Sequence, residues 1–190
     1  MRVEIVTGEH LKKMQRTTIT PKMVENFAML YGTQGENIEF TPGDYMQLEI
    51  PKYQLSFNEI EIGQTKNFQV VITESLVNDF AKLSGDFSPI HVNSEYANST
   101  KFKGRIVHGM LLASLLSRMV GMYLPGKHAL YSTQTLEFHN PCFIGEEVTV
   151  SSTVIDKSES TKIVKIESKI TNEKNEILLN GIGRIIVRND

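Results

Sequence analysis

The sequence predicts an α+β fold in which one long buried helix is wrapped by a curved antiparallel sheet. Two observations carry this prediction. Residues 108–123 are apolar around most of the helical circumference, which is typical of a helix without a solvent-facing side. Residues 129–190 are rich in β-branched side chains and are divided into short runs by turn residues. A wrapped sheet buries one of its own faces and all faces of the helix.

Strands are expected after the long helix wherever apolar and polar residues alternate between turn signals. The polar run NEKN at residues 172–175 predicts a hairpin turn between the last two strands. Gly181 and Gly183 lie inside the last strand, where a bulge or the close approach of another backbone is expected. The four expected strands are residues 129–139, 146–155, 161–171 and 176–187.

A further strand and a shorter helix precede the long helix. The strand is expected within residues 60–71. Thr73 is a suitable cap for the helix that follows, and Glu74 stands in the first turn, where the helix dipole favours a negative charge. Gly85 is expected to end this helix, because glycine readily adopts the left-handed conformation of a helix C-terminus.

Composition limits the class of protein. The chain has 190 residues, of which 40% are hydrophobic, enough for one packed domain with a small appendage. The net charge of −2 argues against a nucleic-acid-binding protein. The single cysteine, Cys142, cannot form an intrachain disulfide and is expected to be a buried, inert thiol. No stretch resembles a signal peptide or a membrane span, so a soluble cytoplasmic protein is expected.

Four basic residues near the middle of the chain allow two interpretations. The simpler is a solvated face, because lysine and arginine are mostly exposed. The alternative is contact with the phosphates of a nucleotide-like ligand. The four residues are Lys101, Lys103, Arg105 and Lys127.

The first 58 residues contain a segment that resembles a later one. Residues 19–33 match residues 72–86 at a constant offset, with seven of the fifteen aligned positions identical. One interpretation is a degenerate copy of a duplicated unit. The other is that two capped amphipathic helices share the same requirements. We therefore divide the chain into an N-terminal extension, residues 1–58, and a main domain, residues 59–190.

The most informative stretch begins at Asp86, directly after the helix-ending glycine. His91 follows five residues later, with Pro89 stiffening the chain between them. A carboxylate and an imidazole on one rigid turn can act on one water molecule as an acid/base pair. By spacing alone, a capping aspartate and a hydrogen-bonded loop histidine are the simpler explanation of the pair, and the residues that follow must decide.

The start of the long helix adds a second component. Gly109 opens this helix, and the first N–H groups of a helix lack partners within it. Without a side chain at this position, a ligand can approach the backbone closely. These N–H groups could polarise a thioester carbonyl and stabilise an enolate-like oxyanion. His108, just before Gly109, is expected to set up the helix start.

Several motifs in the same order resemble one known family. Asp86-Phe87-Ser88-Pro89-Ile90-His91 is similar to the signature Asp-x-Asn-Pro-x-His of the MaoC-like hot-dog-fold hydratases, and within them of the (R)-specific enoyl-CoA hydratases. An Ile-Val-His-Gly-Met-Leu segment follows at residues 106–111, as it does in the family. The resemblance continues through Leu-Pro-Gly-Lys at residues 124–127, Leu-Glu-Phe-His-Asn-Pro at 136–141 and Gly-Glu-Glu-Val at 145–148, and covers roughly residues 60–188.

This resemblance implies a hot-dog fold and the hydration of a trans-2-enoyl-CoA to an (R)-3-hydroxyacyl-CoA, or the reverse. Asp86 and His91 would be the catalytic pair, and Gly109 would bind the thioester carbonyl. Ser117, on the long helix, matches a polar position near the family's active site. No metal or cofactor is expected. The substrate would be a thioester of CoA or of acyl carrier protein, and the protein a homodimer or a dimer of dimers.

Two features depart from the family's pattern. Ser88 replaces the asparagine of the signature, so a shorter hydroxyl stands where an amide would brace the loop. The N-terminal extension is the second departure. Two other functions on the same fold therefore stay open, namely an acyl-thioesterase and a non-catalytic module that binds acyl thioesters or a partner. Ser88 and His108 are candidate supporting residues of the site.

Overall fold

The structure is a computed structural model, and it describes residues 4–5, 17–18 and 53–188. The chain divides into two compact units, Met1–Ile50 and Pro51–Asp190. In the first unit, strands β1 (Glu4–Ile5) and β2 (Thr17–Thr18) pair in antiparallel fashion. The possible repeat at residues 19–33 lies outside the described residues.

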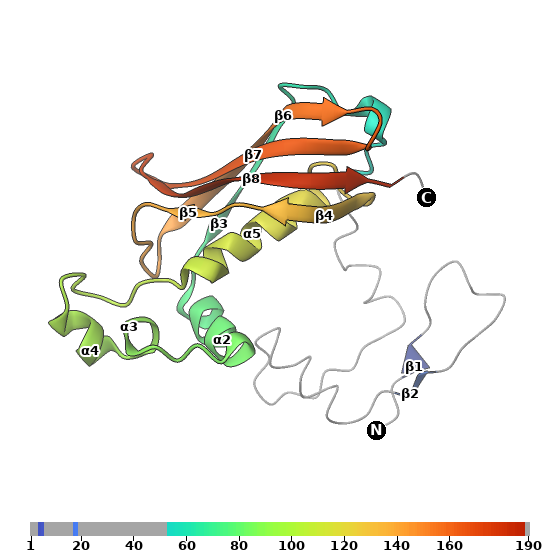
Figure 1. Cartoon of the computed structure of the whole chain (residues 1–190). Coiled ribbons are helices and arrows are strands. Elements are labelled where there is room, and N and C mark those ends of the chain that lie inside the picture. Colours follow the sequence, from blue (N-terminus) through green and yellow to red (C-terminus); the bar gives the residue numbers. More distant parts are fainter. Residues whose placement is uncertain (1–3, 6–16, 19–52, 189–190) are drawn as a thin grey trace. The chain divides into compact units, whose positions relative to one another are not determined.

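The second unit is built on a six-stranded antiparallel sheet (Figure 1). Its strands follow the spatial order β3-β6-β7-β8-β4, and the short β5 pairs with β8. Helix α5 lies along one face of this sheet, so the helix-and-sheet plan predicted from the sequence is confirmed. The strands are β3 (Thr65–Val71), β4 (Ala129–Gln134), β5 (Glu137–Phe138), β6 (Glu147–Ser158), β7 (Ile163–Asn172) and β8 (Ile177–Val187).

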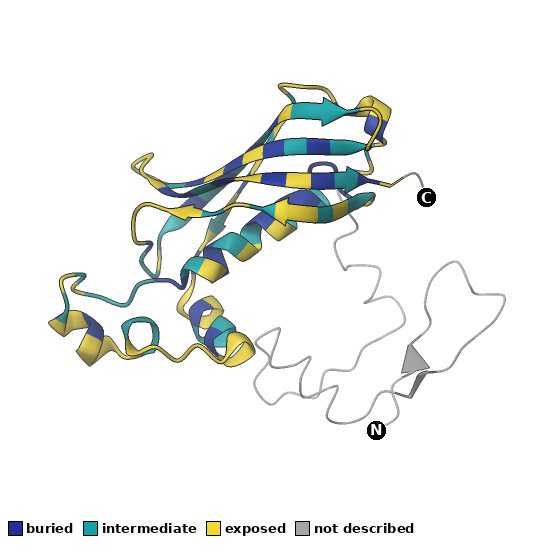
Figure 2. Cartoon of the chain, in the orientation of Figure 1, coloured by how far each residue is buried: buried dark blue, intermediate teal, exposed yellow. Residues whose placement is uncertain are grey.

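Alternation of buried and exposed residues explains the three long strands. Along β6, valines alternate with polar residues, and Val148, Val150 and Val154 are fully buried. The same period of two appears in β7 (Figure 2). The polar run after β7 forms the predicted hairpin turn, in which the side-chain oxygen of Asn172 accepts hydrogen bonds from two backbone N–H groups of the turn. Asn175 adopts a positive φ of 61° there.

One predicted strand is interrupted. Residues 129–139 were expected to be continuous, but β4 ends at Gln134 and β5 begins at Glu137. The reason is the close approach of Gly181 in β8, where a β-carbon would stand 1.8 Å from the carbonyl oxygen of Thr135. The predicted approach of another backbone at Gly181 is therefore confirmed, and it separates the two strands. β4 also has a register shift between Tyr131 and Thr133.

The shorter helix has the predicted ends. Helix α2 (Glu74–Ser84) begins after Thr73, whose side chain accepts a hydrogen bond from the N–H of Leu76 at 3.2 Å. It ends at Gly85, which has a left-handed φ of 76°. Two short helices follow that the sequence did not indicate, α3 (Pro89–Val92) and α4 (Ser94–Ser99).

The long helix α5 (Gly109–Met122) is buried on one side only, which corrects the prediction that every face is buried. Met110 is 58% exposed, and Ser114 and Ser117 are exposed as well. The opposite side packs against the sheet through Leu111, Leu112, Leu116, Met119 and Val120. No helix in the described part of the chain is long and apolar enough to cross a membrane.

The chain just before β3 packs against the end of α5. The N–H of Tyr53 donates to the carbonyl of Met122, and the N–H of Leu55 donates to that of Pro125. Phe57 is only 2% exposed, and the Lys157 ammonium lies 4.4 Å from the centre of its ring. Residues 53–58, at the end of the predicted extension, thus contribute to the core of the second unit.

Candidate active site

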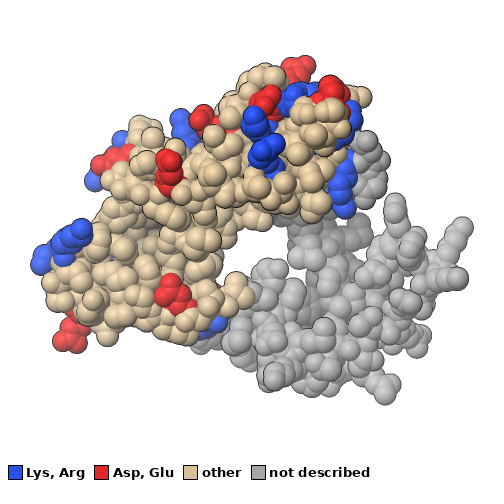
Figure 3. Space-filling view, in the orientation of Figure 1, with Lys and Arg blue, Asp and Glu red and all other residues tan. Residues whose placement is uncertain are grey.

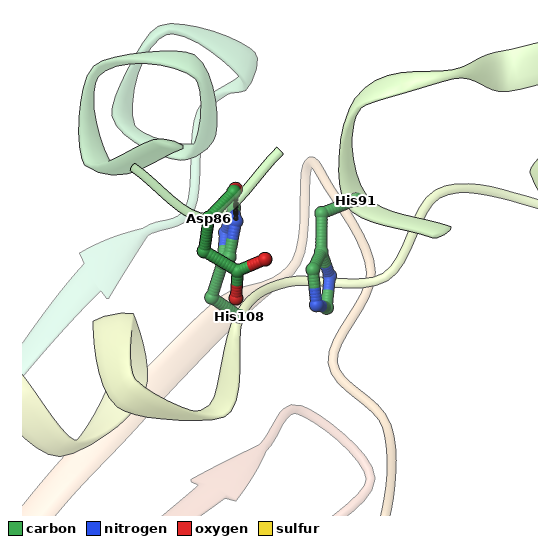
Figure 4. A group of neighbouring side chains, drawn as sticks. All are labelled: Asp86, His91 and His108. Atoms are coloured by element: carbon green, nitrogen blue, oxygen red, sulfur yellow. Dashed lines mark hydrogen bonds between the residues drawn. The ribbon is translucent and has the colours of Figure 1, made fainter. Parts of the chain in front are cut away.

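Asp86, His91 and His108 come together at the start of α5. Each offers one nitrogen or oxygen atom, and these atoms all lie within 4.8 Å of one another. Figure 4 shows the three side chains converging on the same small region from three segments. Asp86 stands in the loop after α2, His91 in α3, and His108 at the residue before α5. The structure therefore gathers the two residues predicted as a catalytic pair.

Backbone turns orient Asp86. The left-handed Gly85 redirects the chain, and the N–H of Asp86 donates to Ser84 Oγ at 3.2 Å. Asp86 Oδ1 accepts a hydrogen bond from the N–H of Ser88 at 3.1 Å. One carboxylate oxygen is thereby engaged in holding the turn. Asp86 itself is exposed, so its carboxylate is accessible to solvent and ligand.

The tautomer of His91 follows from its hydrogen bond. Its Nδ1 lies 2.8 Å from the carbonyl oxygen of Ile106. Since a carbonyl oxygen only accepts, Nδ1 of the neutral ring must carry the hydrogen, and Nε2 then presents a lone pair. A histidine in this form can take a proton through Nε2.

His108 has the opposite arrangement and a different environment. Its Nε2 lies 3.0 Å from the carbonyl oxygen of Asp86, so Nε2 carries the hydrogen. The ring is 2% exposed and stacks on His91 with a centroid distance of 4.0 Å. Burial lowers the pKa of His108 from its ordinary value, because desolvation disfavours the charged form and outweighs the hydrogen bond to Asp86. His108 is thus a neutral ring that supports both Asp86 and His91.

A mostly apolar cavity of about 420 Å³ opens beside His91 and Gly109. Gly109 is the first residue of α5, so its N–H has no acceptor within the helix. The ring of Phe138 covers this position, and a β-carbon on Gly109 would lie 2.7 Å from Phe138 Cε1. Asp86 is not among the residues that line this cavity, but its carboxylate lies close to His91, which does line it. The lining also includes Lys101, Phe102, Ile106, Leu112, His139, Asn140, Cys142 and Leu178.

Ser117 lies apart from these residues. It follows Gly109 by eight positions along α5, a distance of about 12 Å at the usual helical rise. It lines a second cavity of about 500 Å³, formed between α5 and β4. Met110, Ser114, Tyr131 and Leu136 belong to the same cavity. The structure therefore does not bring Ser117 into the cavity of His91 and Gly109.

The basic residues divide into two groups. Lys101, Lys103 and Lys127 are exposed, as a solvated face requires. The side chain of Arg105 is only 9% exposed and forms an ion pair with Glu74, so neither interpretation of the basic residues describes it. No sequence signal identified this pair, because 31 residues separate its members. Phe138 was missed for a similar reason, since its position over Gly109 depends on the pairing of β5 with β8.

Comparison with known proteins decides the family. Residues 57–175 match the MaoC like domain. The chain belongs to the MaoC-like family. It is 37% identical over 127 residues to the (R)-specific enoyl-CoA hydratase of Aeromonas caviae, covering 67% of this chain and 95% of the relative. It is 38% identical to the enzyme of the same name from Rhodospirillum rubrum, covering 69% of this chain and 90% of the relative.

Solved structures confirm the hot-dog fold of this MaoC-like chain. The R-hydratase PhaJ1 from Pseudomonas aeruginosa, in its unliganded form, aligns with a TM-score of 0.69 and 31% identity. That alignment covers 72% of this chain and 88% of the other. The (R)-hydratase from A. caviae aligns with a TM-score of 0.67 and 36% identity, covering 68% and 98% of the two chains.

Ser88 marks where this MaoC-like chain departs from the family signature. It stands at the N-cap of α3, with φ of −53° and ψ of 129°, and its side chain makes no capping hydrogen bond. The loop is instead held by the backbone N–H of Ser88, which donates to Asp86. The Ser88 hydroxyl therefore does not take over, at the start of α3, the bracing role expected of the asparagine in the signature.

The donor set of Asp86, His91 and His108 is also one that could hold a divalent metal ion. Two histidines and a carboxylate suit Zn²⁺, but His108 has its Nε2 engaged with Asp86 and could offer only the buried Nδ1. His91 likewise could offer only Nε2. In each ring the nitrogen engaged with a carbonyl would orient the imidazole, and the other nitrogen would be the ligand atom.

Proposed function

We propose that this chain catalyses the (R)-specific hydration of a trans-2-enoyl-CoA to an (R)-3-hydroxyacyl-CoA, or the reverse dehydration. One observation carries the proposal: the atoms offered by Asp86 and His91 lie within 4.8 Å of each other, beside a cavity that His91 and Gly109 line. The relatives of the same family that are named hydratases support it. The chain is therefore a hydro-lyase whose catalytic domain comprises residues 59–190 together with residues 53–58, which pack into the same core, and the residues before them form the extension.

His91, Asp86 and Gly109 each have a separate role in the proposed reaction. His91 Nε2 takes one proton from a water molecule that Asp86 Oδ2 also holds. The water oxygen bonds to C3 of the substrate, and the electron pair of the C2–C3 double bond moves toward the thioester carbonyl. The N–H of Gly109 stabilises the negative charge on the carbonyl oxygen. The proton held by the acid/base pair then passes to C2, so that one water is added on one face.

The apolar cavity fits an acyl thioester. Its walls are mostly hydrophobic side chains, with few polar groups near His91 and Gly109. Lys101, at the same cavity, is a cation that suits the phosphate of a phosphopantetheine arm. This phosphate is common to CoA and acyl carrier protein, and we assign CoA as the carrier on the names of the relatives.

A second copy of the chain is the partner we propose for the exposed side of α5. Among the described strands, β4 is an edge strand that pairs only with β8. Beside it, Met110 and Leu130 are 58% and 52% exposed, a combination that favours association. In the view of Figure 3, few charged side chains lie between β4 and α2. Two copies joined along β4 would extend the sheet and cover this side of α5.

The oligomeric state can be measured by light scattering of the full chain. The parent should be a dimer or a dimer of dimers, and Leu130→Lys should shift it toward the monomer. Ile62→Lys is the matched control, because Ile62 is 63% exposed in the turn before β3. A monomeric parent, or equal effects of the two substitutions, would show that the proposed surface is wrong.

The activity can be tested by the loss of the enoyl absorbance of crotonyl-CoA, followed by chiral analysis of the product. Asp86→Asn and His91→Ala should each reduce kcat by at least about 100-fold, the size typical of removing acid/base catalysis. The proposal fails if both variants hydrate crotonyl-CoA as fast as the parent. Release of free CoA would indicate a thioesterase, and binding without turnover would indicate a non-catalytic module.

A further inference from the structure

Arg105 connects three segments of the site. It lies just before α5, and its guanidinium reaches α2 and α3 with three different nitrogens. Nε donates to the carbonyl oxygen of His91 at 2.5 Å. One terminal nitrogen donates to Glu74 Oε1 and the other to Asn78 Oδ1, both at 2.6 Å. The side chain of Arg105 is 9% exposed and that of Glu74 is 64% exposed, so the bonds to His91 and Asn78 are better shielded from water than the bond to Glu74.

The segment that carries Arg105 also makes other contacts with the site. The carbonyl of Ile106 fixes Nδ1 of His91, and the N–H of Ile106 donates to the carbonyl of Ile90 at 3.3 Å. His108, two residues further on, donates to the carbonyl of Asp86. Arg105 joins these contacts to α2, the helix whose end leads directly into Asp86. Its place thus determines how His91 and Asp86 stand relative to the start of α5.

We propose that Arg105 is a positioning residue that holds His91 in its Nδ1–H tautomer, with Nε2 directed at the reacting water. It acts through the backbone of α3 and does not touch the substrate. The part about the water rests on the function proposed above, whereas the part about the tautomer does not. A displacement of the base by about 1 Å can cost about 100-fold in rate, so a rigid anchor for His91 bears directly on turnover.

The planar guanidinium is required because its donors point in three fixed directions. Lysine would keep the positive charge beside Glu74 but would offer a single nitrogen, which cannot reach α2 and α3 together. Arg105→Lys therefore separates the geometry from the charge. Lys82→Met is the matched control, because it removes a cation from the same helix α2, where Lys82 pairs with Asp79 at the surface.

The first measurement is the tautomer of His91 by ¹⁵N NMR of the full chain without ligand. Its resonances are assigned from their loss in His91→Gln. In the parent and in Lys82→Met, His91 should be in the Nδ1–H form, and in Arg105→Lys it should become a mixture of the two tautomers. An unchanged Nδ1–H form in Arg105→Lys would overturn the proposal.

The second measurement is steady-state hydration of crotonyl-CoA. Arg105→Lys should lower kcat by about 10- to 100-fold, with KM changed less than threefold. Asn78→Ala and Glu74→Gln each remove or weaken one anchor and should have smaller effects. Thermal unfolding and circular dichroism show whether Arg105→Lys is folded, and if it is not, the same comparison is made with Asn78→Ala. A normal kcat in a folded Arg105→Lys would contradict the positioning role.

The two measurements separate this inference from the proposed function. If the parent does not hydrate enoyl-CoA but Arg105→Lys changes the His91 tautomer, the function is wrong and the positioning stands. If the parent is active and Arg105→Lys leaves both the tautomer and kcat unchanged, the positioning is wrong and the function stands.

Discussion

The rings of His91 and His108 stack with centroids 4.0 Å apart and planes inclined by 29°, yet each is held through a different nitrogen. Nδ1 of His91 donates to Ile106, whereas Nε2 of His108 donates to Asp86. The half-buried His91 lines the cavity. The buried His108 packs against the ring of His91, and its burial lowers its pKa. Two identical side chains thus have separate tasks, and this difference can be tested.

The pKa of His108 predicts a pH-dependent stability. The folded protein has a lower pKa for His108 than the unfolded chain, so the unfolded chain binds the proton first as the pH falls. The contribution of neutral His108 to the free energy of unfolding is complete above the ordinary histidine pKa of about 6.5. It is lost as the pH falls through the lowered pKa of the folded protein. His108→Gln keeps a donor for Asp86 but does not titrate. Its free energy of unfolding should therefore decrease less than that of the parent between about pH 7 and pH 5.

Denaturant unfolding at several pH values measures this difference. His139→Gln is the control, because the side chain of His139 is 43% exposed. The difference between His139→Gln and the parent sets the size of the change that a histidine substitution outside the cluster produces. If His108→Gln and the parent lose stability in parallel, burial of His108 is not the cause.

Gly109 and Phe138 should be coupled in activity. Gly109→Ala places a β-carbon 2.7 Å from Phe138 Cε1, so the ring must move away from the start of α5. Because Phe138 is 52% exposed, it can move, and we expect stability to change by less than about 1 kcal/mol. We expect kcat/KM to fall about 10-fold, since a shift of a single donor already affects oxyanion stabilisation.

The double variant Gly109→Ala/Phe138→Leu tests the cause, with Phe138→Leu alone as the control. If contact with the ring is responsible, Gly109→Ala should cost less in the Phe138→Leu background than in the parent. An equal cost in both backgrounds would show that the added methyl group interferes with the substrate itself.

Two cap positions should respond differently to the loss of a side-chain oxygen. Thr73 caps α2 through a hydrogen bond from Leu76, so Thr73→Ala should destabilise the protein by about 1 kcal/mol. Ser88 makes no side-chain capping bond at α3, so Ser88→Ala should change stability by less than about 0.5 kcal/mol. Urea unfolding of the two variants gives both values. Equal losses would mean that the Ser88 hydroxyl supports its loop after all.

The features that the sequence predicts well are those governed by neighbouring residues. Thr73 and Gly85 define both ends of α2, because capping and left-handed glycine act within one turn. The alternation in residues 146–155 predicts most of β6 for the same reason, as each side chain faces away from the next. The positions of Asp86 and His91 follow from one short loop.

The features that it does not predict depend on distant partners. The break between β4 and β5 requires knowing that Gly181 lies against Thr135, which follows from strand pairing. The exposed side of α5 carries Ser114 and Ser117 at helical spacing, but the apolar residues around them dominate the pattern and hide this signal. The role of Arg105 depends on contacts with Glu74 and Asn78, 31 and 27 residues earlier.

Asp86, His91, Arg105 and His108 all belong to the stretch of chain between α2 and α5, and Gly109 is the first residue of α5. A recombination event that exchanged this stretch together with α2 would transfer these residues along with Glu74 and Asn78, the partners of Arg105. The strands could meanwhile diverge to suit other acyl groups. The residues of the proposed acid/base pair thus lie in one part of the chain, and the strands that contribute Phe138 and Leu178 to the cavity lie in another.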